Sequence, residues 1–347
     1  MVSLPFLLLS CRYNYAQLKD DYSAKIDSLI QATSPRSFNG VILITQHGQT
    51  KYAKAYGYAD VEHNRALTLQ DNFRIQSNSK QITAVLILRE VEKGNIDLHS
   101  PIRKYLPDLP QSWADTVTVH QLLNFSAGVE DINKPLVFKP GTDFLYSVIA
   151  YTLLGNIVEK VTGKTYIQAA TDLFKELKMK NSFCDQEDKN QHRLVKGYLG
   201  STALKVTQVR IADVLPTPKE RTDFTAAGGI ISNLEDLNRG DTNLHNGKIL
   251  KPETYKLMTS YSITSAHEAF GNENIGYGYG VRISDETPIS YIGHSGKGLG
   301  FVSIKIYFPQ KGVDLIVLEN LYSEDSSLHY YFEIKIKDIV MNSTLIQ

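Results

Sequence analysis

Ser77 and Lys80 are the residues of this sequence that most directly suggest catalysis. They belong to Ser77-Asn78-Ser79-Lys80, which is the only Ser-x-x-Lys in the chain. Residues three apart on a helix lie on the same face, so the Ser77 hydroxyl and the Lys80 amine can converge. Burial lowers the pKa of a lysine, and a neutral amine beside a serine can take its proton and create a nucleophile. The alternative is that Ser77 only caps a helix and that Lys80 is a surface lysine.

The segment that carries this pair is predicted to be a buried helix over 77–92. Its middle, Thr83–Leu88, is apolar almost all round, which is typical of a helix inside a protein. Gly94 follows as a natural end of the helix. We therefore expect Lys80 to lie inside the molecule.

Composition excludes several classes of protein. The chain has 347 residues, 42% hydrophobic and 21% charged, with 37 Lys+Arg against 37 Asp+Glu. These values are ordinary for globular proteins and exclude disordered, collagen-like and coiled-coil chains. The balanced charge gives no reason to expect a nucleic-acid partner. Two cysteines, Cys11 and Cys184, are too few for a disulfide framework or a Cys-based zinc site, and we expect no metal and no cofactor.

The N-terminus resembles the end of a bacterial lipoprotein signal. Leu4–Leu9 is a short apolar run, and Cys11 follows it. Such a run is too short to span a bilayer, which needs about 20 residues. We expect residues 1–19 to be a signal and tether, Cys11 to be lipidated, and the protein to reside in the periplasm or cell envelope. The alternative is a frayed apolar end with an incidental cysteine.

The remaining patterns place strands near both ends of the chain and helices in the middle. This arrangement predicts an α/β (α+β) protein, with one domain formed by 20–94 and 216–347 and a helical domain at 95–215. Catalytic groups are expected in the cleft between them. Predicted helices cover 20–32, 151–161, 251–260 and 325–342, a hairpin joins 40–45 to 51–58, and predicted strands cover 228–232, 277–283, 290–293, 301–308 and 313–319.

Residues 73–109 closely resemble the nucleophile segment of the serine β-lactamase-like hydrolases, which include class C β-lactamases, DD-carboxypeptidases and esterases. In that superfamily Ser-x-x-Lys is followed by Glu-x-Gly and a Lys-Tyr-Leu-Pro loop, here Glu92 to Gly94 and Lys104–Pro107. Pro140–Ser147, Ala226–Ser232 and Gly293–Gly296 resemble further segments in the family's order. The resemblance implies an antiparallel sheet flanked by helices, with an inserted all-helical domain.

The same resemblance implies roles for individual residues. Ser77 would form an acyl-enzyme, and Lys80 and Tyr146 would act together as general base. His294 takes the place of the basic residue of the third motif and would orient the tyrosine or the leaving group. The backbone N–H groups of Ser77 and Lys297 would form the oxyanion hole. Ser295 and Gly296 would contact a small-molecule or peptidoglycan-like acyl substrate, and we expect a monomer.

Two positions depart from the family pattern. Val148 replaces the asparagine that usually pairs with the amide of a peptide-like or β-lactam substrate, and valine cannot make that bond. Phe125 replaces a polar residue and is predicted to be a wall of the substrate site. An esterase, amidase or peptidase is therefore expected rather than an efficient β-lactamase. The alternative is a weak or inactive module that binds peptidoglycan or penicillin.

Overall fold

The computed structural model describes residues 20–185, 193–202, 205–270, 274–285 and 289–347. Cys11 and the predicted tether over residues 1–19 lie outside the described residues. Within the described ranges, no helix combines the length and the apolar character that crossing a membrane requires.

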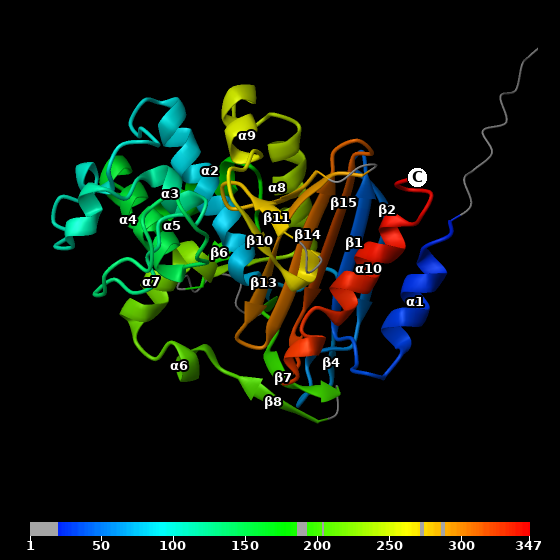
Figure 1. Cartoon of the computed structure of the whole chain (residues 1–347). Helices are drawn as coiled ribbons and strands as arrows, with labels where there is room; N and C mark the ends of the chain where they lie inside the picture. The colour runs from blue at the N-terminus through cyan, green and yellow to red at the C-terminus, as the bar shows by residue number, and fades with distance from the viewer. Residues whose placement is uncertain (1–19, 186–192, 203–204, 271–273, 286–288) are drawn as a thin grey trace, which may run out of the picture.

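A large antiparallel sheet forms the centre of the molecule (Figure 1). Its two long middle strands, β14 (Phe301–Phe308) and β15 (Val313–Glu319), are buried along almost their whole length, because helices cover both faces of the sheet. The predicted hairpin is confirmed as β1 (Gly40–Gln46) and β2 (Gln49–Tyr56). The strand order is β10 (Thr264–Ala266), β11 (Asn274–Tyr277), β12 (Arg282–Ser284), β13 (Tyr291–Gly298), β14, β15, β1 and β2.

Each face of the sheet packs against its own helices. The first helix α1 (Ser23–Gln31) and the last helix α10 (Tyr331–Met341) lie side by side on one face (Figure 1). Their buried residues, such as Ile26 and Val340, form one hydrophobic core with Ile304 of the sheet. The other face packs on α2 (Ser79–Glu92) and α8 (Leu234–His245), which share a second core with the more distant helices. The apolar character predicted for α2 is thus explained by its central position.

The remaining helices are α3 (Val119–Leu123), α4 (Val148–Thr162), α5 (Tyr166–Glu176), α6 (Ile211–Val214), α7 (Pro218–Gly228) and α9 (Pro252–Met258). Most of them gather beside the sheet, at the edge near β10 to β13, while α9 lies next to α8 and α6 lies apart, between β8 (Lys205–Val209) and α7 (Figure 1). Short strands form small separate sheets: β3 (Tyr58–Asp60) with β4 (Arg65–Ala66), β5 (Phe73–Arg74) with β9 (Ile230–Ser232) and β6 (Phe183–Cys184), and β7 (Gly197–Thr202) with β8 and β16 (Leu321–Tyr322).

Several predicted elements need correction. The predicted strand over 277–283 is two strands, β11 and β12, joined by a turn in which Gly280 has a φ of 68°. A side chain at Gly280 would meet the Lys80 carbonyl oxygen at 2.7 Å, so this turn packs directly on α2. Gly228 ends helix α7 instead of beginning a strand. The segment 95–215, predicted to be helical, also contains β6, β7 and β8.

His245, the half-buried histidine at the end of α8, makes the free energy of unfolding depend on pH. The His245 ring stacks on Tyr307 with centroids 4.0 Å apart, and its Nδ1 lies 2.8 Å from the Tyr255 hydroxyl. Desolvation lowers the pKa of His245 to about 4. The unfolded chain therefore binds a proton between pH 6.5 and 4 that the folded chain does not bind, and the free energy of unfolding falls as the pH falls through this range.

We predict that acidification from pH 7.5 to 5 costs about 2 kcal/mol through this one residue. His245→Gln should reduce the acid sensitivity by that amount, because glutamine does not titrate. Urea unfolding of both proteins at the two pH values measures the effect. Equal losses in the wild-type protein and the variant would contradict the assignment.

Candidate active site

Ser77 lies in a strained turn at the entrance to α2. The predicted helix begins two residues later than expected, at Ser79, and Ser77 belongs to the 3₁₀ turn Gln76–Asn78. Gln76 has a φ of 50°, a conformation that residues other than glycine rarely adopt. The turn leaves Ser77 partly exposed at the N-terminal end of the helix, while Gln76 is buried.

Strand β13 holds this turn in place by direct backbone packing. A Cβ atom on Gly296 would lie 2.5 Å from the Ile75 carbonyl oxygen and 2.8 Å from the Gln76 Cβ, so only glycine fits. From the neighbouring strand, the Ser303 hydroxyl donates to the Ile75 carbonyl at 2.9 Å and accepts from the Asn78 side-chain amide at 2.8 Å. The position of Ser77 is therefore set by the sheet as well as by its own helix.

Lys80 is buried, with its Nζ atom beside Ser77. The amine lies 3.0 Å from Ser77 Oγ and donates to the Ala227 carbonyl at 2.6 Å. Its side chain is 1% exposed, and no carboxylate of the described residues forms an ion pair with it. Desolvation lowers the pKa of Lys80, and the nearby Tyr146 only partly opposes this shift. The amine is thus placed and tuned to exchange a proton with the Ser77 hydroxyl.

Tyr146 approaches the same point from the segment that precedes α4. Lys80 Nζ lies 4.9 Å from the centre of the Tyr146 ring, and the tyrosine is 38% exposed. Phe125, with a φ of 62°, packs its ring 4.5 Å from that of Tyr146. The next residue, Ser147, caps α4 by accepting from the Ala150 N–H at 3.1 Å. Ser77, Lys80 and Tyr146 are therefore brought together from two distant segments of the chain.

His294 lies behind Tyr146, with ring centroids 6.4 Å apart. Its Nδ1 lies 2.6 Å from the Ser295 carbonyl oxygen, and its Nε2 lies 2.9 Å from the Tyr277 hydroxyl. Desolvation, followed by the charges of Arg282 and Lys80, holds the pKa of His294 well below its usual value. This shift favours the uncharged form of the His294 ring, whereas the family has a basic residue at the position that His294 was predicted to take.

Two of the four residues predicted to contact substrate are buried in the structure. Phe125 is 1% exposed and lies among aromatic rings under Tyr146, so it supports the tyrosine and does not form an open wall. Ser295 is 2% exposed and lies 3.3 Å from His267 Nε2. Val148, at the first turn of α4, is 41% exposed, and Gly296 faces the nucleophile turn.

Lys297, the second predicted oxyanion donor, lies three residues after His294 on β13. Strand β12 pairs only with Tyr291–Gly293, so it does not cover the edge of β13 from His294 onward. The Lys297 side chain points to the other face of the sheet, where its Nζ pairs with Glu268 at 2.7 Å. Only the backbone of Lys297 is therefore available on the side of Ser77.

Tyr277 and Arg282, which lie beside His294, were not predicted from the sequence to belong to the site. The Arg282 guanidinium lies 5.2 Å from the centre of the Tyr277 ring, is 2% exposed and donates to Ser265 Oγ at 3.1 Å. Among the described residues, no carboxylate pairs with Arg282, and its Nε has no hydrogen-bond partner. The signal for Arg282 in the sequence was its charge, because it lies within an otherwise uncharged segment, 277–283, that was predicted to be a strand.

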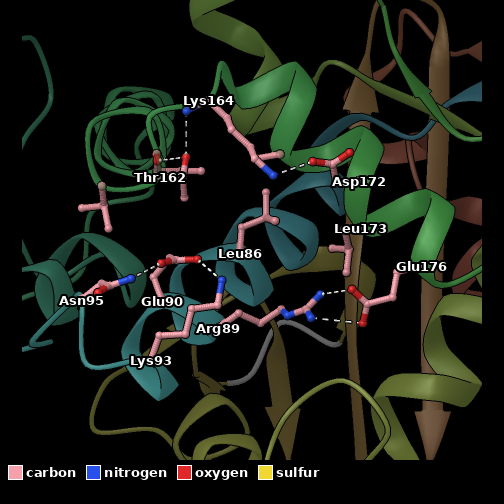
Figure 2. A pocket seen from close by; sticks show the side chains of 13 residues that line it. Leu86, Arg89, Glu90, Lys93, Asn95, Thr162, Lys164, Asp172, Leu173 and Glu176 are labelled. Atoms are coloured by element: carbon pink, nitrogen blue, oxygen red, sulfur yellow. Dashed lines mark hydrogen bonds and ion pairs between the residues drawn. The ribbon is translucent and has the colours of Figure 1, made fainter.

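A cavity of about 360 Å³ lies at the opposite end of α2 from Ser77 (Figure 2). Its rim carries three ion pairs, Arg89 with Glu176, Lys93 with Glu90, and Lys164 with Asp172. These charges neutralise one another, so the cavity offers no unpaired charged group.

One group of residues in the described ranges could hold a metal ion by the proximity of its ligand atoms. It consists of Asp60, Glu62 and His63. Lys196 Nζ already lies 3.0 Å from Asp60 and 2.9 Å from Glu62, so an ammonium group occupies the place of a cation.

The packing of Gly296 against the nucleophile turn can be tested by adding one methyl group. Gly296→Ala should lower the free energy of unfolding by about 1–3 kcal/mol, because the backbone at Ile75 cannot move without displacing Gln76. Gly240→Ala is the matched control, since its Cβ would meet only the flexible end of Met179 at 3.3 Å. Urea unfolding measures both. If Gly296→Ala is as stable as the control, β13 does not hold the turn.

Several known proteins are similar to this chain in sequence. Protein flp from Staphylococcus aureus (strain MW2) is 26% identical over 340 residues, which cover 89% of this chain and 65% of that protein. The chain thus spans about two thirds of the length of that curated relative. Esterase EstB from Burkholderia gladioli is 29% identical over 189 residues, 43% of this chain and 48% of the esterase.

Solved structures share the fold. The octameric penicillin-binding protein homologue from Pyrococcus abyssi has a TM-score of 0.79 at 26% identity, covering 93% of this chain and 78% of that one. D-amino acid amidase from Ochrobactrum anthropi SV3 has a TM-score of 0.74 at 24% identity, covering 92% and 96%. The family described as Beta-lactamase matches residues 26–334. The chain, which the resemblance of its motifs had placed among the serine β-lactamase-like hydrolases, belongs to the Beta-lactamase family.

Proposed function

We propose that this protein is a serine acyl-hydrolase that forms an acyl-enzyme on Ser77. The observation that carries the proposal is the 3.0 Å contact between Ser77 Oγ and the buried amine of Lys80. A lysine whose pKa is lowered by desolvation has a neutral fraction that can accept the serine proton. Esterase EstB and the D-amino acid amidase, which this chain resembles, are both hydrolases by name.

The proposed reaction proceeds in two stages. Ser77 Oγ attacks the substrate carbonyl carbon while its proton passes to Lys80 Nζ, and the backbone N–H groups of Ser77 and Lys297 stabilise the oxyanion. The bond to the leaving group then breaks, and the leaving group takes the proton from Lys80 through the Tyr146 hydroxyl. Water next attacks the acyl-enzyme ester, which releases the carboxylic acid and restores Ser77.

Val148 favours substrates that do not need an amide partner in the acyl site. Its exposed apolar surface stands two residues after Tyr146, at the start of α4. A substrate amide placed against it loses a hydrogen bond, whereas an apolar acyl group gains a contact. We therefore expect esters and amides with apolar acyl groups to react faster than β-lactams.

Arg282 favours a substrate with an anionic group beyond the scissile bond. A buried cation without a carboxylate partner is costly, and the positive charge of Arg282 acts on both His294 and Tyr146. Arg282 is 2% exposed and does not touch the substrate, but its positive charge would attract a substrate carboxylate bound near Tyr146. This supports peptide-type substrates that end in a free carboxylate.

Covalent labelling tests the proposed nucleophile. A fluorophosphonate probe should label the wild-type protein and fail to label Ser77→Ala. Ser79→Ala is the matched control, because its hydroxyl lies two residues away and accepts from the Ile230 N–H at 3.1 Å instead of facing Lys80. Folded wild-type protein that resists both this probe and a labelled penicillin would instead support the alternative, a non-catalytic module with the same fold.

Turnover assays separate the substrate classes. We expect p-nitrophenyl butyrate to be hydrolysed with a higher kcat/KM than nitrocefin, because Val148 offers no amide partner. Faster hydrolysis of nitrocefin would contradict the proposed acyl preference.

The contribution of Arg282 can be read from a matched pair of substrates. Arg282→Met should lower kcat/KM about tenfold or more for an N-acyl dipeptide with a free carboxylate, since the variant no longer attracts that carboxylate. The same dipeptide with a C-terminal amide should be nearly unaffected. Equal losses for both substrates would show that Arg282 only supports the fold.

A further inference from the structure

We propose that Tyr277 is a positioning residue that holds His294 in a single neutral tautomer, so that His294 takes no proton during the reaction. The proposal rests on the serine acyl-hydrolase function proposed above and assigns the proton transfers to Ser77, Lys80 and Tyr146. It changes the role of His294, for which the third motif had suggested a charged group.

The hydrogen bonds of the imidazole define the tautomer. Nδ1 lies 2.6 Å from the Ser295 carbonyl oxygen, which can only accept, so Nδ1 carries the proton. Nε2 of the neutral ring is then an acceptor, and the Tyr277 hydroxyl, 2.9 Å away, donates to it. Both ring nitrogens are occupied by groups of the protein, and neither is free to serve the substrate.

The surroundings of His294 disfavour the imidazolium form. The ring is 1% exposed, and no carboxylate of the described residues pairs with it. Its partner across the sheet, Lys305 of β14, is neutralised by Asp241 at 2.6 Å. The titratable groups that face the ring are Lys80 from α2, Tyr146 before α4, Tyr277 of β11, Arg282 of β12 and His267 before the turn Glu268–Phe270. None of these groups is a carboxylate, and the charges of Arg282 and Lys80 both oppose protonation of the ring.

Tyr277 is itself fixed in the geometry that the bond needs. It is fully buried, its ring packs 4.8 Å from that of Phe125 and 5.6 Å from that of Phe144, and Arg282 lies over its face. Burial raises the pKa of the Tyr277 phenol well above its usual value, so the hydroxyl keeps the proton that it donates. Replacement by phenylalanine removes one oxygen atom and leaves this aromatic packing intact.

The loss of that oxygen has a defined consequence. His294 Nε2 would become a buried acceptor without a donor, and the ring would be free to move its proton to Nε2 or to bind a second proton. Moving the proton to Nε2 breaks the bond to the Ser295 carbonyl, on the strand that packs against the nucleophile turn. A second proton keeps that bond but places a positive charge beside Arg282 and Lys80. Catalysis would then acquire a histidine ionisation that the wild-type protein lacks.

Tyr277→Phe and a matched control test the proposal. The control is Tyr255→Phe, which removes a tyrosine hydroxyl from another histidine, the half-buried His245 at the C-terminal end of α8. The first readout is ¹⁵N NMR of the histidine rings, with the His294 signals identified by their absence in His294→Gln. The second is the pH profile of kcat/KM for p-nitrophenyl butyrate between pH 5 and 9.

We expect wild-type His294 to carry its proton on Nδ1 and to remain neutral down to pH 5, and Tyr255→Phe to share this behaviour. In Tyr277→Phe we expect the His294 proton to be shared between Nδ1 and Nε2, or the ring to bind a second proton between pH 5 and 9. The value of kcat/KM should then fall about tenfold at pH 6 and recover at higher pH.

A wild-type ring protonated on Nε2, or doubly protonated at pH 7, overturns the proposal even if Tyr277→Phe does not fold. So does a Tyr277→Phe protein with the wild-type tautomer and pH profile. Because the NMR measurement needs no turnover, a protein without hydrolase activity would refute the proposed function and leave the tautomer assignment separately tested.

Discussion

The burial of the Lys80 amine without a carboxylate partner is the constraint on which the rest of this site depends. Two other buried cations are neutralised: Arg36 pairs with Glu319 at 2.7 Å, and Lys305 pairs with Asp241 at 2.6 Å. Lys80 has instead a hydroxyl, a carbonyl oxygen and the faces of Tyr146 and Tyr151. These neighbours lower the free-energy cost of burying the amine, but none of them is a carboxylate that would keep the amine protonated. The same arrangement that would be a defect in a structural core is what a general base requires.

Lys80 can act as a general base only if Ser77 stays within hydrogen-bond distance of it. Two unusual backbone conformations help to hold the residues of the site in place. Gln76 and Phe125 both adopt positive φ, one next to Ser77 and the other under Tyr146. The lack of a side chain at Gly296 lets β13 touch the first of these turns. The sheet is thus the rigid element that fixes the positions of the two loops, and α2 holds the Lys80 amine between them.

Much of the fold could be predicted from the sequence, because its strongest signals are long apolar segments. The strands at 301–308 and 313–319 and the helix at 151–161 appear with matching or slightly extended bounds. The prediction failed where glycine-rich turns interrupt an apolar run, as between β11 and β12, and where a strained turn precedes a helix, as at Gln76. The family resemblance implied that Ser77, Lys80 and Tyr146 work together, and in the structure the Lys80 amine lies near both other side chains. It could not show that Phe125 is covered or that Tyr277 and Arg282 surround His294, because these facts depend on which face of a strand each side chain occupies.

The most direct test of the central claim is the pH dependence of the acylation rate, measured by stopped-flow with a fluorescent fluorophosphonate under single-turnover conditions. If buried Lys80 is the base, the rate should rise with pH through a midpoint clearly below 10.5, the ordinary pKa of a lysine, and this limb should vanish in Lys80→Met, which keeps the length of the side chain. A midpoint at the ordinary lysine value, or the same rate and the same profile in Lys80→Met, would contradict the account.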